Sequence, residues 1–241
     1  MKIDYRLMLI VVTISALFAF DQAFAHITNE ASQGAAAETS ASGGDIMLLV
    51  AAEIIPETPD FEPDVPLSQA DLAAWAAFAA GLGEDAGTAD ALAALALEHE
   101  LVASLIGDAV CRDINELFFG GQLVIDDPEA VPTRGEAATF IAANLGSSAG
   151  EVLLGNRNLR LGPTGVVAQI EKQRKPDGGI TYFITVGATR LAMYAHGRVG
   201  NGPTDLMQWE GRSVRRSLVR RLGDRDVWAY LEAESIPAVP E

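Results

Sequence analysis

The side chains best suited to acid–base chemistry lie in the C-terminal half of the chain, on segments with the composition of adjacent strands. The candidates are Tyr182, Tyr194 and His196, with Arg190 close by in the sequence. Alternate residues of a strand point to the same face, so Tyr194 and His196 would lie side by side. A histidine beside a tyrosine could polarise a carbonyl group and move a proton near neutral pH. The alternative is that this face is open to solvent, or that His196 simply ends its strand.

Acidic and basic residues are separated along the chain. Residues 26–130 hold one basic residue against 20 acidic ones, a net charge of −19, whereas residues 131–241 hold 14 against 11, a net charge of +3. The basic cluster near the C-terminus consists of Arg212, Arg215, Arg216, Arg220 and Arg221. It could bind an anion or the acidic front segment, or, on an edge strand, prevent sheets of different molecules from pairing. The acidic segment could equally be a solvated surface.

Composition and missing motifs exclude several kinds of site. With 17 basic and 33 acidic residues the formal net charge is −16, which disfavours phosphate backbones, so we expect no nucleic-acid partner. The one cysteine, Cys111, excludes an intrachain disulfide and a cysteine-rich zinc site, and its apolar neighbours predict an inert, buried thiol. The chain contains no phosphate-binding loop, dinucleotide-binding glycine motif, HExxH or GxSxG. We therefore expect no cofactor and no metal site.

The N-terminus has the pattern of an export signal. Lys2 and Arg6 precede an apolar run over residues 7–20, and Ala23 and Ala25 form a small-x-small cleavage site. The apolar run is shorter than the roughly 20 residues of a membrane span. The pattern predicts a signal peptide over residues 1–25, cleavage after Ala25 and release into the periplasm or the medium, with no stable membrane span after cleavage. An uncleaved membrane anchor is the alternative.

A leader rich in acidic residues, proline, alanine and serine follows over residues 26–66. Within it, residues 26–45 have the composition of a flexible linker, and the apolar run 46–55 predicts a strand or short helix packed on the domain. Residues 67–87 then hold an additional helix, for which Ser68 is a good N-cap.

Three further helices and one short strand are expected before the sheet. Thr88 opens a helix that ends at Gly107, and Asp108 caps the next helix, which stops at Gly120. Residues 122–126 predict a short strand. Thr133 and Glu136 then form a capping box for a helix that runs to Gly146.

From residue 151 onward, β-branched and aromatic residues predict a sheet. The expected strands cover residues 152–161, 166–174, 180–186, 189–199 and 226–235. Residues 212–222 have apolar side chains at helical spacing, but the glycine and aspartate that follow also fit a hairpin turn. We favour the strand for this segment and leave the helix open.

This order of elements resembles the nuclear transport factor 2-like fold, including its SnoaL-like branch. The local sequence is similar to that family in ELVASLIGDA (100–109), INELFF (114–119), VIDDP (124–128), PTRGEA (132–137) and RRLGDRDVWAY (220–230). These segments resemble the family's first and second helices, its first strand, the start of its third helix and its closing hairpin. The resemblance covers residues 88–236 and leaves residues 237–241 as a tail.

The resemblance implies an α+β fold with a curved antiparallel sheet that forms a cone and with helices on the concave face. The family's core is shorter than this chain, so the acidic, partly disordered leader and the extra helix that the sequence predicts, residues 46–87 among them, are additions ahead of that core. Family members enclose a pocket in the cone, and the enzymes among them place Asp, His or Tyr there. The expected pocket residues here are Tyr182, Arg190, Tyr194, His196 and Trp228. Asp126 and Asp127 would match the general base of the family's isomerases, although an ordinary Asp-Pro turn with Pro128 fits equally.

Two functions follow from this reading. We expect a non-enzymatic module that binds a small apolar ligand or a protein partner through the pocket or a sheet face, because a fold alone supplies no chemistry. The alternative is a small-molecule isomerase, cyclase or dehydratase that uses His196 with Tyr194 or Asp126. Both faces of strand 180–186 are partly apolar, so the outer face needs a cover. A second copy would give a homodimer, and the chain's own segment 46–55 is the rival cover.

Overall fold

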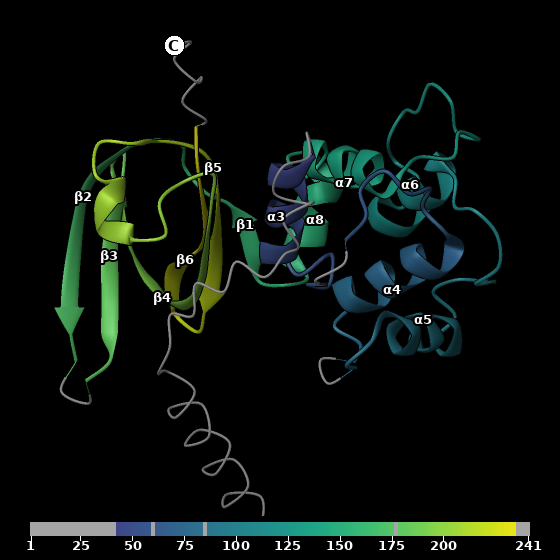
Figure 1. Ribbon diagram of the computed structural model, residues 1–241, viewed down its shortest axis with the longest axis horizontal. Helices are drawn as coiled ribbons and strands as arrows, with labels where there is room; N and C mark the ends of the chain where they lie inside the picture. The colour runs from purple at the N-terminus through teal and green to yellow at the C-terminus, as the bar shows by residue number, and fades with distance from the viewer. Residues whose placement is uncertain (1–41, 59–60, 84–85, 176–177, 235–241) are drawn as a thin grey trace, which may run out of the picture.

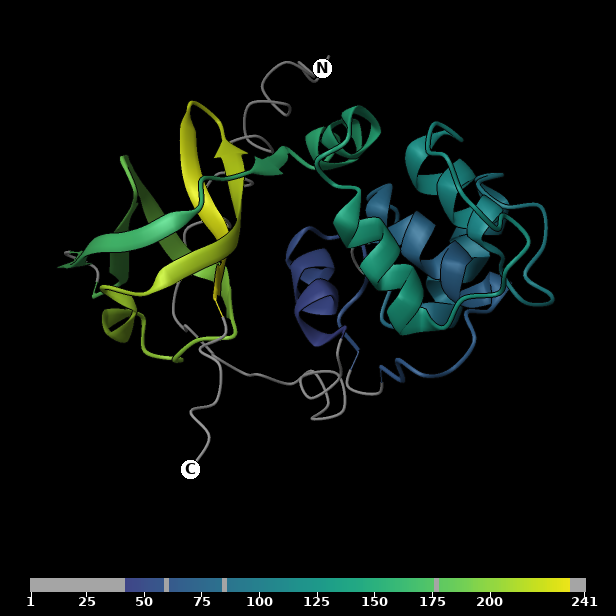
Figure 2. The same ribbon diagram turned by 90° about the horizontal axis from the view of Figure 1, so that it is seen from above.

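The computed structural model describes residues 42–58, 61–83, 86–175 and 178–234. These residues form an α+β fold with six α-helices and a six-stranded mixed sheet. The helices gather on one side of the molecule and the larger part of the sheet on the other, and helix α3 (Gly43–Ala51) lies on the part of the helical side that is nearest the sheet (Figure 1; Figure 2). The predicted export signal, the leader up to residue 41 and the C-terminal tail lie outside the described residues.

Local sequence signals place the starts of three helices correctly. The five helices after α3 are α4 (Gln69–Ala79), α5 (Ala89–Glu98), α6 (Cys111–Phe119), α7 (Arg134–Ala143) and α8 (Ser148–Gly155). The N-caps predicted at Ser68, Thr88 and Thr133 are confirmed, since each side chain accepts a hydrogen bond from the backbone N–H three residues on. Gly120 ends α6 with a φ of 59°, where glycine carries no steric penalty. Within the described ranges, no single helix meets the length and hydropathy of a membrane span; α7 and α8 meet them only as a pair bent by 100°.

The helix after Thr88 is shorter than predicted. It ends at Glu98 instead of Gly107, because Glu100 adopts a φ of 57° and the Leu101 N–H bonds back to the Ala96 carbonyl. The apolar residues that continue the helical spacing therefore lie in a loop, where Ile106 is 88% exposed. The prediction of Asp108 as the next N-cap is also wrong: it pairs with Ser68 in a β-bridge, and α6 begins after Val110.

One expected strand is absent from the described residues, and another is largely replaced by a helix. Residues 122–126 form no strand, because the Asn115 side chain bonds both the N–H and the carbonyl of Leu123, at 3.1 and 3.0 Å, in place of a neighbouring strand. Most of the strand expected over residues 152–161 is helix α8, which Ser147 caps through the Gly150 N–H. Only β1 (Leu159–Leu161) remains of that strand.

The sheet closes on itself. Strands β2 (Gly165–Arg174), β3 (Ile180–Val186) and β4 (Thr189–Gly200) form an antiparallel meander, and β5 (Ser213–Leu222) and β6 (Arg225–Ala233) form a hairpin. One edge of β5 pairs with β1 and β2, and its other edge pairs with β6, which also pairs with β4. Residues 212–222 thus confirm the favoured strand. The expected wholly antiparallel sheet is wrong, because the chain crosses through the short helix η1 (Leu206–Trp209) and β5 before β6 returns parallel to β4.

The apolar run 46–55 is a core element, and the short-helix alternative is confirmed for its first part. Ile46, Leu49 and Ile54 are completely buried. They belong to a cluster that joins α4, α6, α7 and α8 to Leu218 and Tyr230 of the sheet. A second cluster fills the inside of the sheet around Trp228, whose indole N–H donates to the Ile184 carbonyl at 2.9 Å. Segment 46–55, which the sequence offered as a possible cover for the outer face of the sheet, therefore packs between the sheet and the helices.

Ion pairs attach this segment to the arginine cluster. Asp45 pairs with Arg216 of β5, and Glu53 bonds both Arg157 and Arg220 at 2.5 Å. Of the two interpretations of the acidic segment, docking onto the arginine-rich strand is confirmed for these residues.

A buried carboxylate completes the arginine network. Glu232, with no exposed surface, accepts hydrogen bonds from Arg215 at 2.6 Å, from Arg216 at 2.5 and 3.1 Å, and from Asn201 at 2.9 Å. Burial alone would lower the pKa of Arg216, but the hydrogen bonds and charges of Glu232 and Asp45 raise it above its ordinary value. The guanidinium is therefore firmly charged, and the pairs hold α3 against β5 and β6.

Candidate functional site

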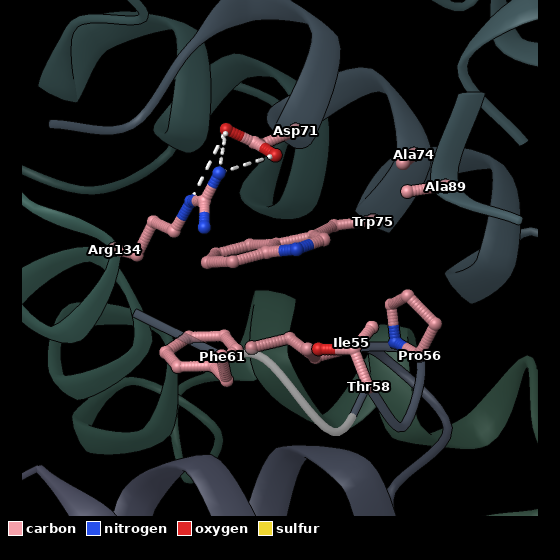
Figure 3. Close-up of a pocket in the computed structure, with 9 residues that line it drawn as sticks. All are labelled: Ile55, Pro56, Thr58, Phe61, Asp71, Ala74, Trp75, Ala89 and Arg134. Atoms are coloured by element: carbon pink, nitrogen blue, oxygen red, sulfur yellow. Dashed lines mark hydrogen bonds and ion pairs between the residues drawn. The ribbon is translucent and has the colours of Figure 1, made fainter. Parts of the chain in front are cut away.

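A partly enclosed pocket of about 220 Å³ lies among the helices, beside the segment that follows α3 (Figure 3). Its lining residues are Ile55, Pro56, Thr58, Phe61, Asp71, Ala74, Trp75, Ala89 and Arg134. Most of these side chains are apolar, and the polar groups are few, which is the usual composition of a small-molecule site.

Two aromatic rings form the centre of this pocket. Trp75 and Phe61 stack with ring centroids 6.0 Å apart and planes inclined by 17°, and their exposed fractions are 4% and 7%. Figure 3 shows the indole of Trp75 between the Arg134–Asp71 pair on one side and the segment with Ile55 and Phe61 on the other. No hydrogen bond joins the indole N–H to another residue that lines the pocket.

An ion pair closes the polar side of the pocket. The Nε and Nη2 atoms of Arg134 donate to the Asp71 carboxylate at 3.0–3.2 Å, and Nη1 lies 3.8 Å from Oε2 of Glu62. Asp71 also accepts the Ser68 hydroxyl at 2.6 Å as part of the N-terminal cap of α4. The pair is about one-fifth exposed on each side, so the guanidinium is held by a carboxylate that the helix cap itself fixes.

The candidate residues come from three separate parts of the chain. Asp71 and Trp75 are four residues apart on α4 and share a helix face. Arg134 is the first residue of α7, and its backbone N–H bonds the Val65 carbonyl at 2.9 Å. The i, i+4 spacing of Asp71 and Trp75 is a signal that sequence analysis could have used, but nothing in the sequence places Arg134 or Phe61 beside them.

A more open groove of about 320 Å³ lies on the solvent-facing side of the sheet. It brings together two of the predicted pocket residues, Arg190 and Tyr194, with Phe183 and Asp226. The Arg190 guanidinium carbon lies 4.5 Å from the centre of the Phe183 ring, and its Nη2 bonds Glu171 at 2.7 Å. The cations here are therefore engaged with aromatic rings and carboxylates of the same sheet.

The other predicted site residues lie elsewhere. Tyr182 and Trp228 are buried in the inner cluster of the sheet, and His196 is exposed. Pairing of β4 with β6 shifts from Met193↔Trp228 to Arg198↔Tyr230, so four residues of β4 face one residue of β6. This bulge breaks the strict alternation that predicted a shared face for Tyr194 and His196. Exposed Asp126 follows α6, at the other end of the molecule from β4 (Figure 1).

Comparison with known proteins does not supply a function. No family model matches the chain, no curated protein is similar to it, and no solved structure matches it. The nuclear transport factor 2-like resemblance over residues 88–236 stays a prediction, and function has to be argued from the geometry of the sites.

The described residues give no support for thiol or metal chemistry. Cys111 is half-buried at the start of α6, and burial, followed by the charges of Asp127 and Glu136, raises the pKa of its thiol. A raised pKa leaves less of the reactive thiolate at neutral pH. Among the described residues, no group of three or more His, Cys, Asp or Glu side chains is arranged to hold a metal ion.

The groove carboxylate Asp226 gives a pH-dependent prediction. Hydrogen bonds from Arg160 at 2.9 Å and Arg221 at 3.2 Å hold the pKa of Asp226 below its ordinary value. A lowered folded-state pKa contributes stability above the unfolded-state value of about 4, and this contribution is lost as the pH falls through the folded-state pKa. We expect Asp226→Asn to destabilise the protein slightly at pH 7 and not at pH 2, as measured by urea unfolding. The control is Asp224→Asn, since that side chain is 91% exposed; equal effects of the two variants at pH 7 would contradict the prediction.

Proposed function

We propose that this chain is a non-enzymatic module that binds a small, mainly apolar ligand in the pocket of Trp75, Phe61 and Arg134. The observation that carries the proposal is the nearly buried, stacked pair of rings that lines a partly enclosed space of about 220 Å³. Apolar pockets with a few polar groups that orient the ligand are the usual form of small-molecule sites.

The size of the pocket limits the ligand. It is smaller than the roughly 300–1,000 Å³ of sites for drug-sized molecules. A cavity of about 150 Å³ lined by apolar side chains is sufficient to bind benzene. A ligand with one ring or a short branched chain therefore fits the available space.

The enzymatic alternative finds no assembled site among the described residues. Of His196, Tyr194 and Asp126, only Tyr194 lines either of the two pockets described above. In the pocket itself, the Asp71 carboxylate already accepts hydrogen bonds from Ser68 and Arg134, which leaves it poorly placed as a general base.

Three further features belong to the proposal. Following the predicted signal, the module acts in the periplasm or the medium. The cone-like curvature of the sheet with helices on its concave face, and the homodimer, stay predictions. The burial of α3 against the sheet removes part of the reason for the homodimer, because the chain itself supplies apolar cover.

Filling the pocket tests the proposal. Ala89 lines the pocket and is exposed at the start of α5, so Ala89→Phe should occupy the space with little effect on folding. We expect ethylbenzene at saturating concentration to raise the Tm of the chain from His26 onward, by mass action on the folded state. The Ala89→Phe variant should lose this rise.

The matched control is Ala94→Phe, another exposed position of α5 that does not line the pocket. It should keep the full rise in Tm. An equal rise in both variants would place the ligand elsewhere, and no rise in the unmodified chain would contradict binding of a small apolar molecule.

A further inference from the structure

We infer that the ligand of the Trp75 pocket is a neutral molecule with an apolar body and one hydrogen-bond acceptor, such as a ketone, an ester or a lactone. This inference rests on the proposed function and names the ligand class of the same site. It follows from the charges around the pocket, the donors that face it and the shape of its apolar wall.

The charges around the pocket disfavour an ionic ligand. One cation, Arg134, is matched by the Asp71 carboxylate at 3.0 Å, and a second carboxylate, Glu62, lies 3.8 Å from the same guanidinium. An anionic ligand near Arg134 would meet both carboxylates, which repel it. A cationic ligand gains little from Asp71, whose carboxylate is already paired with Arg134, and would lose its hydration in an apolar pocket. A neutral ligand avoids both penalties.

The polar groups left over in the pocket are mainly donors. The indole of Trp75 can only donate a hydrogen bond, and it donates to none of the other lining residues (Figure 3). In Arg134, Nε and Nη2 are used on Asp71, whereas the 3.8 Å from Nη1 to Glu62 exceeds hydrogen-bond length. Figure 3 shows Nη1 directed toward the Trp75 side of the pocket. A ligand that brings an acceptor can take a hydrogen bond from these donors, whereas a ligand without one displaces water from them and leaves them unpaired, which is costly.

The rest of the wall selects an apolar body. Ile55, Pro56, Phe61 and Ala74 contribute no side-chain hydrogen-bonding group, and Phe61 presents a ring that is stacked parallel to the indole. A planar or compact apolar group can contact these side chains while its acceptor reaches a donor at the polar side.

Four probes of similar size test the inference on the full chain from His26 onward. Acetophenone carries an acceptor, ethylbenzene carries none, benzoate is an anion and benzylamine is a cation. The chain has three tryptophans, so its indole N–H groups give three signals in a 1H–15N correlation spectrum, and Trp75→Phe assigns the signal of Trp75. Titration of each probe against this signal gives its Kd.

We expect acetophenone and ethylbenzene both to shift the Trp75 signal, and acetophenone to bind about fivefold more tightly, the gain from one net hydrogen bond. Benzoate and benzylamine should bind at least about tenfold more weakly than acetophenone. If ethylbenzene binds as tightly as acetophenone, or if either ion binds best, the inference is overturned while the proposed function stands. If no probe shifts the Trp75 signal, the proposed function fails with it.

The Trp75→Phe variant separates the indole N–H from the indole ring. It keeps an aromatic side chain, so ethylbenzene, measured by calorimetry, should bind within about twofold of its original Kd. Acetophenone should lose most of its fivefold advantage. If acetophenone keeps its full advantage over ethylbenzene in this variant, Trp75 is not the donor. Thr58→Val then tests the remaining neutral donor, the Thr58 hydroxyl. If neither variant reduces the advantage, the assignment of the donors is wrong.

Discussion

Replacing Glu232 with glutamine is expected to lower the free energy of unfolding by about 3 kcal/mol. The carboxylate has no exposed surface and accepts hydrogen bonds from Arg215, Arg216 and Asn201. Removing its charge leaves two guanidinium groups with a neutral partner, and a glutamine amide would place donors opposite donors. The loss stays at the lower end of the range for buried pairs, because Arg216 keeps Asp45 and Arg215 is half-exposed.

Urea unfolding of the two proteins measures this difference. The control is Glu234→Gln, two residues further along and just after the end of β6, where the side chain is exposed. That variant should change the free energy of unfolding by no more than about 0.5 kcal/mol. A loss below about 1 kcal/mol for Glu232→Gln would mean that the buried network does little to hold the sheet and α3 together.

Replacing Ile54 with alanine is expected to cost about 2–5 kcal/mol, the usual cost of deleting a fully buried aliphatic side chain. Ile54 has no exposed surface and belongs to the cluster that joins the helices to the sheet. The same substitution at Ile106, which is 88% exposed, serves as the matched control and should cost no more than about 0.5 kcal/mol.

This pair of variants tests whether segment 46–55 is part of the core. Chemical unfolding monitored by the fluorescence of the three tryptophans gives both values. Similar values for Ile54→Ala and Ile106→Ala would mean that segment 46–55 is not part of the core.

Helix caps and the strands of the β2–β3 hairpin lie where local patterns in the sequence predict them. Ser68, Thr88 and Thr133 cap the helices that they were expected to cap, because a cap needs only a side-chain oxygen and an N–H three residues away. Strands β2 and β3 lie where β-branched residues are dense and a turn with proline and glycine separates them. These interactions are decided within about ten residues of chain.

Two predictions are wrong because a side-chain hydrogen bond or a backbone turn, and not the spacing of apolar residues, decides the structure. Residues 122–126 have the composition of a strand, but a side chain from α6, Asn115, bonds Leu123 in the place where a strand would pair. Apolar residues after Glu98 continue a helical spacing, yet the backbone turns at Glu100 and leaves Ile106 exposed. The spacing of apolar residues predicts neither the Asn115–Leu123 hydrogen bonds nor the turn at Glu100, because it shows which residues are apolar and not which of them are packed against other residues.

The candidate site could also be predicted only in part from the sequence. The i, i+4 pair of Asp71 and Trp75 can be read from the sequence, but their neighbours Phe61 and Arg134 come from a proline-rich segment and from the start of another helix. The site expected on the sheet relied on regular alternation along β4. The bulge after Met193 removes that regularity, and no feature of the sequence announces it.

The position of α3 has a consequence for how the chain reaches its folded state. Asp45 pairs with Arg216, 171 residues further along the chain, and Glu53 pairs with Arg220, 167 residues further along. Among the described residues, α3 packs mainly against α7 and the strands β4 and β6. Contacts so distant in sequence close late, because the entropy of a long loop is lost before they form. Synthesis supplies α3 before α7 and well before β4 and β6, so the side of α3 that packs on the sheet stays uncovered until those strands are made. The partly folded chain therefore exposes apolar surface through which molecules aggregate. We expect the yield of refolded protein to fall as the protein concentration rises.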